Sequence, residues 1–535
     1  MKMTGAQAII ETLIQEGVDT IFGYPGGTIL PTYDALFEQK HRVHHVLVRH
    51  EQGGVIAAEG YAKSSGKVGV CFATSGPGAT NLVTGITDAL LDSVPLVCIT
   101  GQVASSLIGS DAFQEADIVG ITIPITKWNY QVTKAAEIPH VIAKAFYYAQ
   151  DGRPGPVLID ITKDAQMEMM EYSYQSYQPR RKQSYECTDT QLIQIADLIN
   201  MAKRPLILAG NGVGLANAEM ELLSLAEKAT IPVACTLHGL HNFPSDHELF
   251  AGILGMHGNY APNILTNQAD VIIAIGMRFD DRVTGNLSKY AKQAKIIHID
   301  IDHAEINKNV KAYHHLHTDA KYALTHLWRY VQPNQHTDWN TKFRELYAEE
   351  YNKIIVPELT KQTGIIRMSQ AIDSVSRQTD GRAIIVSDVG QNQMATMRYY
   401  KFKQAKSHIT SGGLGTMGFA LPAAIGAKIA NPQRQVVCVV GDGGIQMNIQ
   451  ELAVIKQEKL AVKILLLNNN YLGMVRQWQE MFYEERYSFV DMHNPDFVAL
   501  AGAYGIKSRK VNNPDELESA INEMLTYPEA YLLEV

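Results

Sequence analysis

Cysteine is scarce in this chain of 535 residues, and the spacings that cysteine adopts in metal and disulfide sites are missing. Only five cysteines occur, and no two form a Cys-x-x-Cys pair. Cys71, Cys98 and Cys438 stand inside apolar runs, which is typical of small buried side chains in a reducing compartment. We therefore expect neither a disulfide framework nor a zinc centre. The histidine-rich stretches at 41–50 and 314–317 match no common zinc spacing either.

Long apolar runs and blocks of like charge are also missing. No apolar run is long enough to span a bilayer, and the first residues have no signal-peptide or transit-peptide character. The net charge is −8, and the longest run of like charge is Arg180-Arg181-Lys182. Nucleic acid and membranes are therefore poor candidates as partners. A cytoplasmic protein is the expectation that remains.

Short apolar runs alternate with longer helical patterns almost throughout the chain, for example at 68–72, 95–99 and 156–159. Continuous apolar runs separated by helices predict parallel strands that are buried on both faces. The expected fold class is therefore α/β, with doubly wound parallel sheets.

Two polar, aperiodic stretches interrupt this rhythm, at 171–189 and at 331–362, and the second includes a charged helical pattern around 343–351. Such stretches are typical of linkers. They divide the chain into three expected domains, at 1–170, 190–330 and 363–535, each of ordinary domain size.

The clearest chemical pattern lies in the third expected domain. An apolar run at 436–440 ends in Gly-Asp-Gly-Gly at 441–444, and the next run, at 463–467, ends in three asparagines at 468–470. Asp442 and Asn469 should therefore meet at the carboxyl ends of neighbouring parallel strands, where ligands bind in such sheets. Carboxylate and amide oxygens suit Mg²⁺, and the glycines admit a diphosphate. An Asp-Gly turn without a ligand is the alternative for either half alone, but the two halves together disfavour it.

This pair resembles the signature of thiamine diphosphate enzymes. Those enzymes need a glutamate that hydrogen-bonds the aminopyrimidine ring of the cofactor, and Glu51 stands at an expected strand-to-helix junction in the first domain. Taken alone, an acid in a first helical turn is explained by the helix macrodipole. Together with Asp442 and Asn469, the catalytic interpretation is favoured.

Four segments carry a closer resemblance. They are FGYPGG at 22–27, SDAFQE at 110–115, TSGGLGTMG at 410–418 and GMVRQW at 473–478. They resemble the catalytic subunit of acetolactate synthase (acetohydroxyacid synthase), and the resemblance runs from about residue 4 to the end. It implies decarboxylation of pyruvate and ligation of the remaining unit to a second 2-keto acid, pyruvate or 2-oxobutanoate, towards branched-chain amino acids.

The resemblance also implies roles for single residues. The expected catalytic residues are Glu51, Gly27, Gln114 and Phe113. The expected contacts to thiamine diphosphate are Gly390, Gln391, Asn392, Gly415, Met417, Gly441, Gly443, Gly444 and Met474. The expected Mg²⁺ ligands are Asp442, Asn469 and the carbonyl of Tyr471. The second keto acid is expected at Arg282, Trp478 and Met474, although helix packing or a surface ion pair would also explain these three.

The middle domain is less informative by itself, because the glycine-rich turn at 210–214 lacks the full dinucleotide fingerprint. The stretch GMRFDDRVTG at 276–285, however, resembles the FAD-contacting segment of biosynthetic acetolactate synthases. The resemblance therefore implies a structural FAD. Its expected contacts are Arg153, Gly210, Asn211, Gly212, Thr236, Leu237, Met256, His257, Gly276, Arg278, Asp280, Asp300 and Asp319.

The family implies a homodimer or homotetramer, in which one cofactor site takes its glutamate and its metal ligands from different subunits, and a small regulatory subunit. The alternatives are a pyruvate oxidase, a glyoxylate carboligase or a simple decarboxylase, a catalytically silent paralogue, and a flavin oxidoreductase. Intact Glu51, Asp442 and Asn469 disfavour the silent paralogue.

Some positions depart from the family pattern. Asn392 replaces a common histidine, Thr28 a frequent alanine, and Ala104, in the expected substrate channel, a common proline. Family members also usually continue past the final apolar run at 531–535 with a tail over the active site. Either this form is shorter or the tail lies outside the sequence, and we expect a less covered active site.

Overall fold

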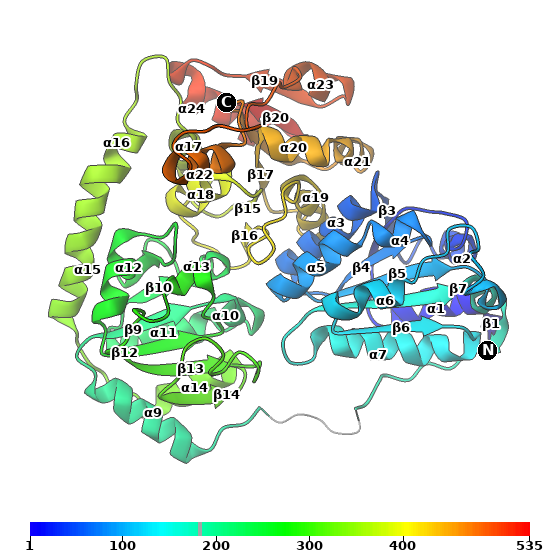
Figure 1. Ribbon diagram of the computed structural model, residues 1–535, viewed down its shortest axis with the longest axis horizontal. Helices are drawn as coiled ribbons and strands as arrows, with labels where there is room; N and C mark the ends of the chain where they lie inside the picture. The colour runs from blue at the N-terminus through cyan, green and yellow to red at the C-terminus, as the bar shows by residue number, and fades with distance from the viewer. Residues whose placement is uncertain (180–184) are drawn as a thin grey trace.

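The computed structural model describes residues 1–179 and 185–535, so residues 180–184 of the expected first linker lie outside the described residues. Within the described residues the chain forms three six-stranded sheets of parallel strands, each flanked by helices (Figure 1). Strands β1 (Lys2–Thr4) and β8 (Met169–Glu171) form a separate antiparallel pair, which brings together the beginning and the end of the first domain. The predicted fold class is confirmed.

The first sheet has the order β3-β2-β4-β5-β7-β6. Its strands are β2 (Thr20–Gly23), β3 (His44–Leu47), β4 (Gly69–Ala73), β5 (Leu96–Gln102), β6 (Trp128–Val132) and β7 (Pro156–Thr162). Its helices are α1 (Gly5–Gln15), α2 (Leu30–Glu38), α3 (Glu51–Ser65), α4 (Pro77–Thr80), α5 (Val83–Asp92), α6 (Ile118–Thr122), α7 (Ile138–Gln150) and α8 (Lys163–Met167). Strands β4, β5 and β7 are buried along their whole length, as the continuous apolar runs predict.

The third sheet repeats that order as β16-β15-β17-β18-β20-β19. Its strands are β15 (Ile384–Ser387), β16 (His408–Ile409), β17 (Val436–Gly441), β18 (Val462–Leu467), β19 (Lys507–Lys510) and β20 (Tyr531–Glu534). Its helices are α17 (Met368–Gln378), α18 (Gln391–Tyr399), α19 (Ala420–Ala430), α20 (Asp442–Met447), α21 (Leu452–Gln457), α22 (Gly473–Phe482), α23 (Phe497–Ala503) and α24 (Leu517–Thr526). Numbered within each sheet, both read 2-1-3-4-6-5, so the strand order reverses between strands 1 and 3.

The middle sheet has a different order, β11-β10-β9-β12-β13-β14, which reads 3-2-1-4-5-6. This is the order of dinucleotide-binding sheets, with the reversal between the first and fourth strands. Its strands are β9 (Pro205–Ala209), β10 (Val233–Cys235), β11 (Phe250–Ile253), β12 (Val271–Ile275), β13 (Lys295–Asp300) and β14 (His314–His317). Its helices are α9 (Asp189–Met201), α10 (Asn211–Leu215), α11 (Glu219–Ala229), α12 (Tyr260–Leu265), α13 (Asp281–Thr284) and α14 (Ala320–Tyr330).

The second expected linker contains the helix α15 (Thr337–Glu350), which continues through a wider turn into α16 (Val356–Leu359). Trp339 anchors α15 to the middle domain, because its buried indole N–H donates to the carbonyl of Pro205 at 2.8 Å. Along the left edge of Figure 1, α15 and α16 run from the middle domain towards the third. The exact domain boundaries stay a prediction.

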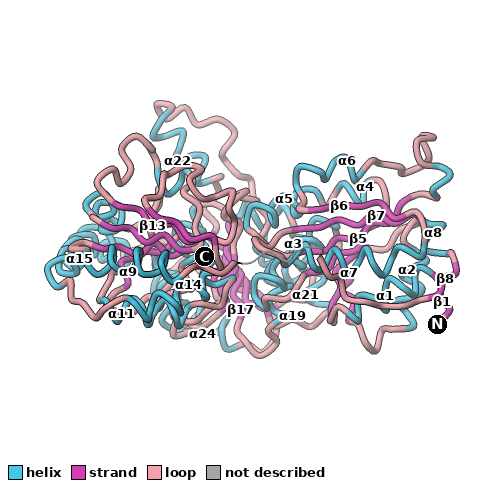
Figure 2. The backbone as a smooth tube through the Cα atoms, turned by 90° about the horizontal axis from the view of Figure 1, so that it is seen from below, coloured by secondary structure: helices cyan, strands magenta, loops and turns pink. Residues whose placement is uncertain are grey.

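The first and third domains meet through two helices that occupy equivalent places, since α3 follows β3 and α19 follows β16. Both helices are almost wholly buried, and they cross at glycines. A Cβ atom on Gly60 would lie 2.1 Å from the carbonyl oxygen of Ala423, and one on Gly426 would lie 1.8 Å from that of Ala57. Only glycine permits so close a contact. Figure 2 shows the first domain on one side of this junction and the other two on the opposite side.

Four of the five cysteines are buried, at 71, 98, 235 and 438. Among the described residues, no helix has both the length and the apolar character that crossing a bilayer would require.

Candidate active site

The first part of the site is a groove at the reversal of strand order in the third sheet. Gly390 follows β15 with φ +140, a conformation that only glycine adopts readily, and Asp442 follows β17 directly. The groove encloses about 60 Å³. The predicted residues that line it are Gly390, Gln391, Asn392, Met417, Gly441, Asp442, Gly443, Gly444, Asn469, Tyr471 and Met474. Gly415, predicted with them, lines a larger neighbouring cavity instead.

The polar groups in the groove fit a diphosphate held through Mg²⁺. Asp442 is 2% exposed, and burial raises the pKa of its carboxyl group. The Asn469 amide oxygen accepts from the Tyr471 backbone N–H at 3.1 Å, which places the two predicted ligands side by side. A Cβ on Gly443 would lie 2.9 Å from the Leu472 side chain, so glycine keeps the floor of the groove open. Oxygen donors beside a glycine floor suit a hard cation and its phosphates.

Asn494 contacts Asp442 beside this groove, and its pattern in the sequence does not indicate this role. Its side-chain N–H₂ group donates to Asp442 Oδ2 at 2.7 Å, to Asn468 Oδ1 at 3.0 Å and to Asn470 Oδ1 at 3.2 Å. The contact joins segments that are far apart in the chain, and an Asn-Pro pair in a loop gives no local sign of it.

The second part of the site surrounds the segment 74–78, which follows β4 at the reversal point of the first sheet. The hydroxyl groups of Thr28, next to Gly27, and Thr74 are 3.0 Å apart. Gly76, at φ +59, packs against the backbone of Gln114. Glu51 begins α3, and its Oε2 accepts from the Asn81 side chain at 2.9 Å. The predicted catalytic residues Glu51, Gly27 and Gln114 therefore gather around one turn.

Phe113, the fourth predicted catalytic residue, is 87% exposed, and a Cβ on Gly27 would meet no atom within 4 Å. The residues described as lining the diphosphate groove do not include Glu51, Gly27, Phe113 or Gln114. Within one chain the two parts are thus separate surfaces.

A cavity of about 810 Å³ lies where the three domains meet. It opens at the carboxyl ends of β9, β10, β12 and β13, the ligand-binding end of a doubly wound sheet. The predicted flavin contacts that line it are Arg153, Asn211, Gly212, Thr236, Leu237, Met256, His257, Gly276, Arg278, Asp280, Asp300 and Asp319. Gly210 is not part of the lining. It packs behind the wall, where a Cβ would lie 2.3 Å from the Gly276 carbonyl oxygen.

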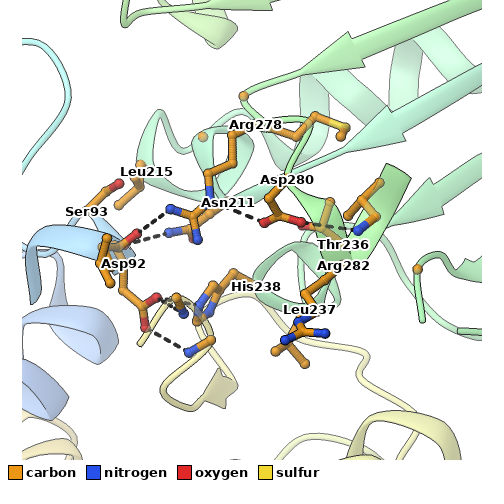
Figure 3. Close-up of a pocket in the computed structure, with 18 of the residues that line it drawn as sticks. Asp92, Ser93, Asn211, Leu215, Thr236, Leu237, His238, Arg278, Asp280 and Arg282 are labelled. Atoms are coloured by element: carbon orange, nitrogen blue, oxygen red, sulfur yellow. Dashed lines mark hydrogen bonds and ion pairs between the residues drawn. The ribbon is translucent and has the colours of Figure 1, made fainter. Parts of the chain in front are cut away.

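Charged groups on the cavity wall come from more than one domain (Figure 3). Arg278 donates to the Leu91 carbonyl at 3.2 Å and pairs with Asp280 at 3.3 Å. Arg153, from the first domain, pairs with Glu305 at 2.9 Å. Burial raises the pKa of Asp300 to about 7. A cavity of this size with glycine turns, three arginines (Arg153, Arg278 and Arg282) and several acids suits an elongated, polar, multiply hydrogen-bonding ligand.

The predicted substrate residues Met474, Trp478 and Arg282 all line the large cavity, and Met474 also lines the diphosphate groove. The Arg282 side chain is 63% exposed, and its guanidinium lies 3.6 Å from the Met256 sulfur. Met474 thus stands on the wall that the two cavities share, whereas Trp478 and Arg282 belong to the large cavity.

Two residues of the site, Asn392 and Thr28, differ from the usual family pattern, and each makes specific contacts. Asn392 is buried and donates to the carbonyls of Asp388, at 3.0 Å, and Val439, at 3.3 Å. Its amide oxygen faces Gly390 and Gly441 on the groove. The Thr28 hydroxyl, in turn, accepts from the Ser75 backbone N–H at 3.0 Å.

Comparison with known families agrees with this geometry in all three domains. Residues 3–121 match the thiamine pyrophosphate enzyme N-terminal TPP binding domain, residues 192–327 match the central domain, and residues 388–535 match the C-terminal TPP binding domain. Fold and site therefore define a thiamine pyrophosphate enzyme.

Curated relatives narrow the class. The chain is 49% identical to the acetolactate synthase large subunit of Lactococcus lactis subsp. lactis (strain IL1403), over 99% of this chain and 92% of the relative. It is 44% identical to that of Haemophilus influenzae (98% and 92%) and 43% identical to the isozyme 2 large subunit of Escherichia coli K12 (100% and 95%). The chain belongs to the acetolactate synthase large-subunit family, and the predicted family is confirmed.

Proposed function

We propose that the chain is an acetolactate synthase that decarboxylates pyruvate and joins the remaining two-carbon unit to a second 2-keto acid, pyruvate or 2-oxobutanoate. The observation that carries the proposal is that Asp442 and Asn469, which follow the neighbouring strands β17 and β18, line one groove at the carboxyl edge of the third sheet. The identity to acetolactate synthase large subunits over nearly the whole chain supports the reaction.

Asp442, Asn469 and the Tyr471 carbonyl would hold Mg²⁺, and Gly390 and Gly443 would admit the diphosphate. Bound thiamine diphosphate supplies a carbon nucleophile and an electron sink for the decarboxylation. Asn81 fixes Glu51 Oε2, so that Oε1, which faces Gly78, holds the proton exchanged with the aminopyrimidine ring. Arg282 binds the carboxylate of the second keto acid, because guanidinium suits bidentate carboxylate contacts. Trp478, Met474 and Phe113 keep water from the reacting atoms, which favours ligation over protonation.

FAD is the ligand we propose for the large cavity. The 3-2-1-4-5-6 strand order of the middle sheet, the cavity at its carboxyl edge and the collection of the predicted contact residues there support this assignment. We propose a structural role for the flavin, since the overall reaction involves no net oxidation or reduction.

We propose a homodimer or homotetramer, and the separation of the two parts of the site supports it. Glu51, Gly27 and Gln114 of one copy would face the groove of a second copy, and exposed Phe113 and Phe489 (99% exposed) would be covered there. Relatives named large subunits support a small regulatory subunit as a further partner, and we propose a cytoplasmic location.

The test uses the purified chain. A flavin absorbance spectrum reports bound FAD, and acetolactate formation from pyruvate is measured with and without thiamine diphosphate and Mg²⁺. We expect acetolactate only when both are present, and a loss of more than 100-fold in Glu51→Gln. Glu11→Gln removes a charge on α1 that pairs with Arg42, far from the proposed catalytic residues in the sequence, and should keep full activity. Acetyl phosphate or acetate as product would indicate a pyruvate oxidase instead, and an unchanged Glu51→Gln would refute the mechanism.

A further inference from the structure

One buried carboxylate, that of Asp92 on the wall of the large cavity, joins all three domains. Asp92 ends α5, and its side chain is fully buried. A carboxylate at the C-terminal end of a helix is disfavoured by the helix dipole, and burial disfavours it further. A buried charge in such a place needs several compensating partners.

Asp92 has partners at both oxygens. Oδ1 accepts from the Gly413 backbone N–H at 2.7 Å and lies 3.0 Å from His238 Nε2 of the middle domain. Oδ2 accepts from Lys63 at 2.7 Å and from the Gly412 backbone N–H at 3.1 Å. The neighbouring His238 and Lys63 outweigh burial, so the pKa of Asp92 stays below its ordinary value.

Lys63 pairs with Asp92 at 2.7 Å and with Glu59, one turn earlier on α3, at 3.0 Å. Glu59 is completely buried, and burial raises the pKa of its carboxyl group well above its ordinary value. Lys63 also donates to the Thr410 carbonyl at 2.7 Å. The ammonium group therefore ties α3 and the start of the segment 410–418 to the same carboxylate.

The segment 411–417 runs from one cavity to the other. Gly412, Gly413 and Gly415 line the large cavity, and Met417 lines the diphosphate groove. Ser411 fixes the bend between them, because its hydroxyl donates to Asp88 at 2.8 Å and accepts from the backbone N–H groups of 415 and 416 at 3.0 and 2.8 Å. Beyond the bend, the Gly418 N–H donates to Asp388 at 3.0 Å.

The segment is packed directly against the proposed flavin wall. A Cβ on Gly412 would lie 2.2 Å from His238 Nε2, and one on Gly413 would lie 3.1 Å from the Arg278 guanidinium. Arg278 and Asn211 in turn donate to the carbonyls of Leu91 and Asp92, at 3.2 and 3.3 Å. Figure 3 shows these side chains reaching the end of α5 from the middle domain. A shift of this wall therefore moves the glycines and the end of α5 together.

From these contacts we propose that Asp92 is a positioning residue that couples the two cofactor sites. Binding of FAD in the large cavity and of thiamine diphosphate in the groove would favour each other, because both need the segment 411–417 in the conformation that Asp92 holds. Such coupling is reciprocal by linkage, so that each cofactor raises the affinity for the other by the same factor. The proposal rests on the FAD assignment made above.

The experiment measures thiamine diphosphate binding rather than turnover. The apoprotein is titrated with thiamine diphosphate at fixed Mg²⁺ in the absence and presence of saturating FAD, with intrinsic fluorescence as the signal. We expect FAD to lower the Kd of the wild-type protein about 5- to 100-fold. In Asp92→Asn, which keeps the shape but loses the charge, the ratio of the two Kd values should fall to within about twofold of one.

Two further variants separate coupling from general damage. Asp19→Asn breaks another aspartate–lysine pair of the first domain, Asp19 with Lys67 at 2.6 Å, without touching segment 411–417, and should keep the wild-type ratio. His238→Leu removes the middle-domain link and leaves Lys63 paired, so it should reduce the ratio even if Asp92→Asn fails to fold.

Three outcomes would contradict the inference. A wild-type Kd ratio of one, with FAD bound according to its absorbance spectrum, overturns the coupling and leaves the FAD assignment intact. An Asp92→Asn ratio equal to the wild-type ratio overturns the role of Asp92. Failure of the wild-type protein to bind FAD at all overturns the FAD assignment and the coupling together.

Discussion

The glycine contact between α3 and α19 makes a quantitative prediction for Gly60→Ala. An alanine Cβ at this position would lie 2.1 Å from the Ala423 carbonyl oxygen, whereas ordinary van der Waals contact begins near 3.4 Å. The two helices must therefore separate by about 1.3 Å. The obstructing atom belongs to the backbone, so no side-chain rotation relieves the clash.

The expected cost follows from that separation. A gap of about 1 Å already forfeits a quarter to a half of the dispersion energy between facing atoms. Overpacking of a buried site costs about 3 kcal/mol at the upper end of its range, and the better helix propensity of alanine returns about 1 kcal/mol. A net loss of about 2 kcal/mol corresponds to a melting temperature about 4–8 °C lower for a domain of this size.

Activity should fall as well, because Glu51 begins the helix that is displaced. A misplacement of about 1 Å in a catalytic group costs about 100-fold in rate. Scanning calorimetry at one fixed rate and acetolactate formation check the two effects, since large chains often unfold irreversibly.

Gly502→Ala is the matched control, because a Cβ on exposed Gly502 in α23 meets no atom within 4 Å. It should raise stability by up to about 1 kcal/mol. Gly426→Ala should resemble Gly60→Ala, and the double variant should cost less than the sum, since one separation of the helices relieves both clashes. A Gly60→Ala protein that melts at the wild-type temperature would refute the reasoning.

Three further variants test single contacts. Asn494→Ala removes the amide that holds Asp442, so the Mg²⁺ concentration for half-maximal thiamine diphosphate binding should rise about 10- to 100-fold in a fluorescence titration; an unchanged value would contradict this. Burial raises the pKa of Glu451 to about 7, so the stability that it contributes is present below about pH 4.5 and lost as the pH rises through 7. The amide oxygen of Glu451→Gln can still accept from the Arg49 N–H. The melting temperature of this variant minus that of the wild type should therefore increase as the pH is raised from 5 to 8, and a difference that does not change with pH would argue against the assignment. The Arg476 guanidinium stacks 4.1 Å from the rings of both Tyr471 and Tyr487, so Arg476→Gln should speed proteolysis within 471–491 in cofactor-free protein, and an unchanged cleavage rate would show that the stack does not hold this segment.

The parts of the site that the sequence predicted are those that local pattern determines. Asp442 and Asn469 each follow a continuous apolar run, and such runs become buried parallel strands whose carboxyl ends share one edge. Glu51 begins a helix immediately after a strand, as its position in the pattern indicates. The flavin contacts came from resemblance alone, because the turn at 210–214 carries no complete fingerprint.

Long-range contacts between common residue types could not be predicted from the pattern. Asp92 stands at the end of an ordinary amphipathic helix, and its partners Gly413 and His238 belong to two other domains. Buried Glu451 supports the start of α3 by accepting from the Arg49 N–H at 3.0 Å, across the same domain interface. No spacing in the chain records these pairings, because they depend on how three domains pack.

The repeated 2-1-3-4-6-5 strand order explains why one chain holds the chemistry in two separate parts. Both outer sheets have a reversal between strands 1 and 3, and each places a glycine-containing turn there, at 24–27 and 74–78 in the first sheet and at 390 and 441–444 in the third. Only the third sheet carries the proposed metal ligands Asp442 and Asn469 at the ends of its strands. Only the first sheet carries Glu51, at the start of the helix that follows its second strand. Because α3 and α19 occupy equivalent positions and pack on each other, the two outer domains of one chain are joined through that contact. In the proposed homodimer, the groove and the Glu51 turn of one copy would each be complemented by the corresponding surface of a second copy.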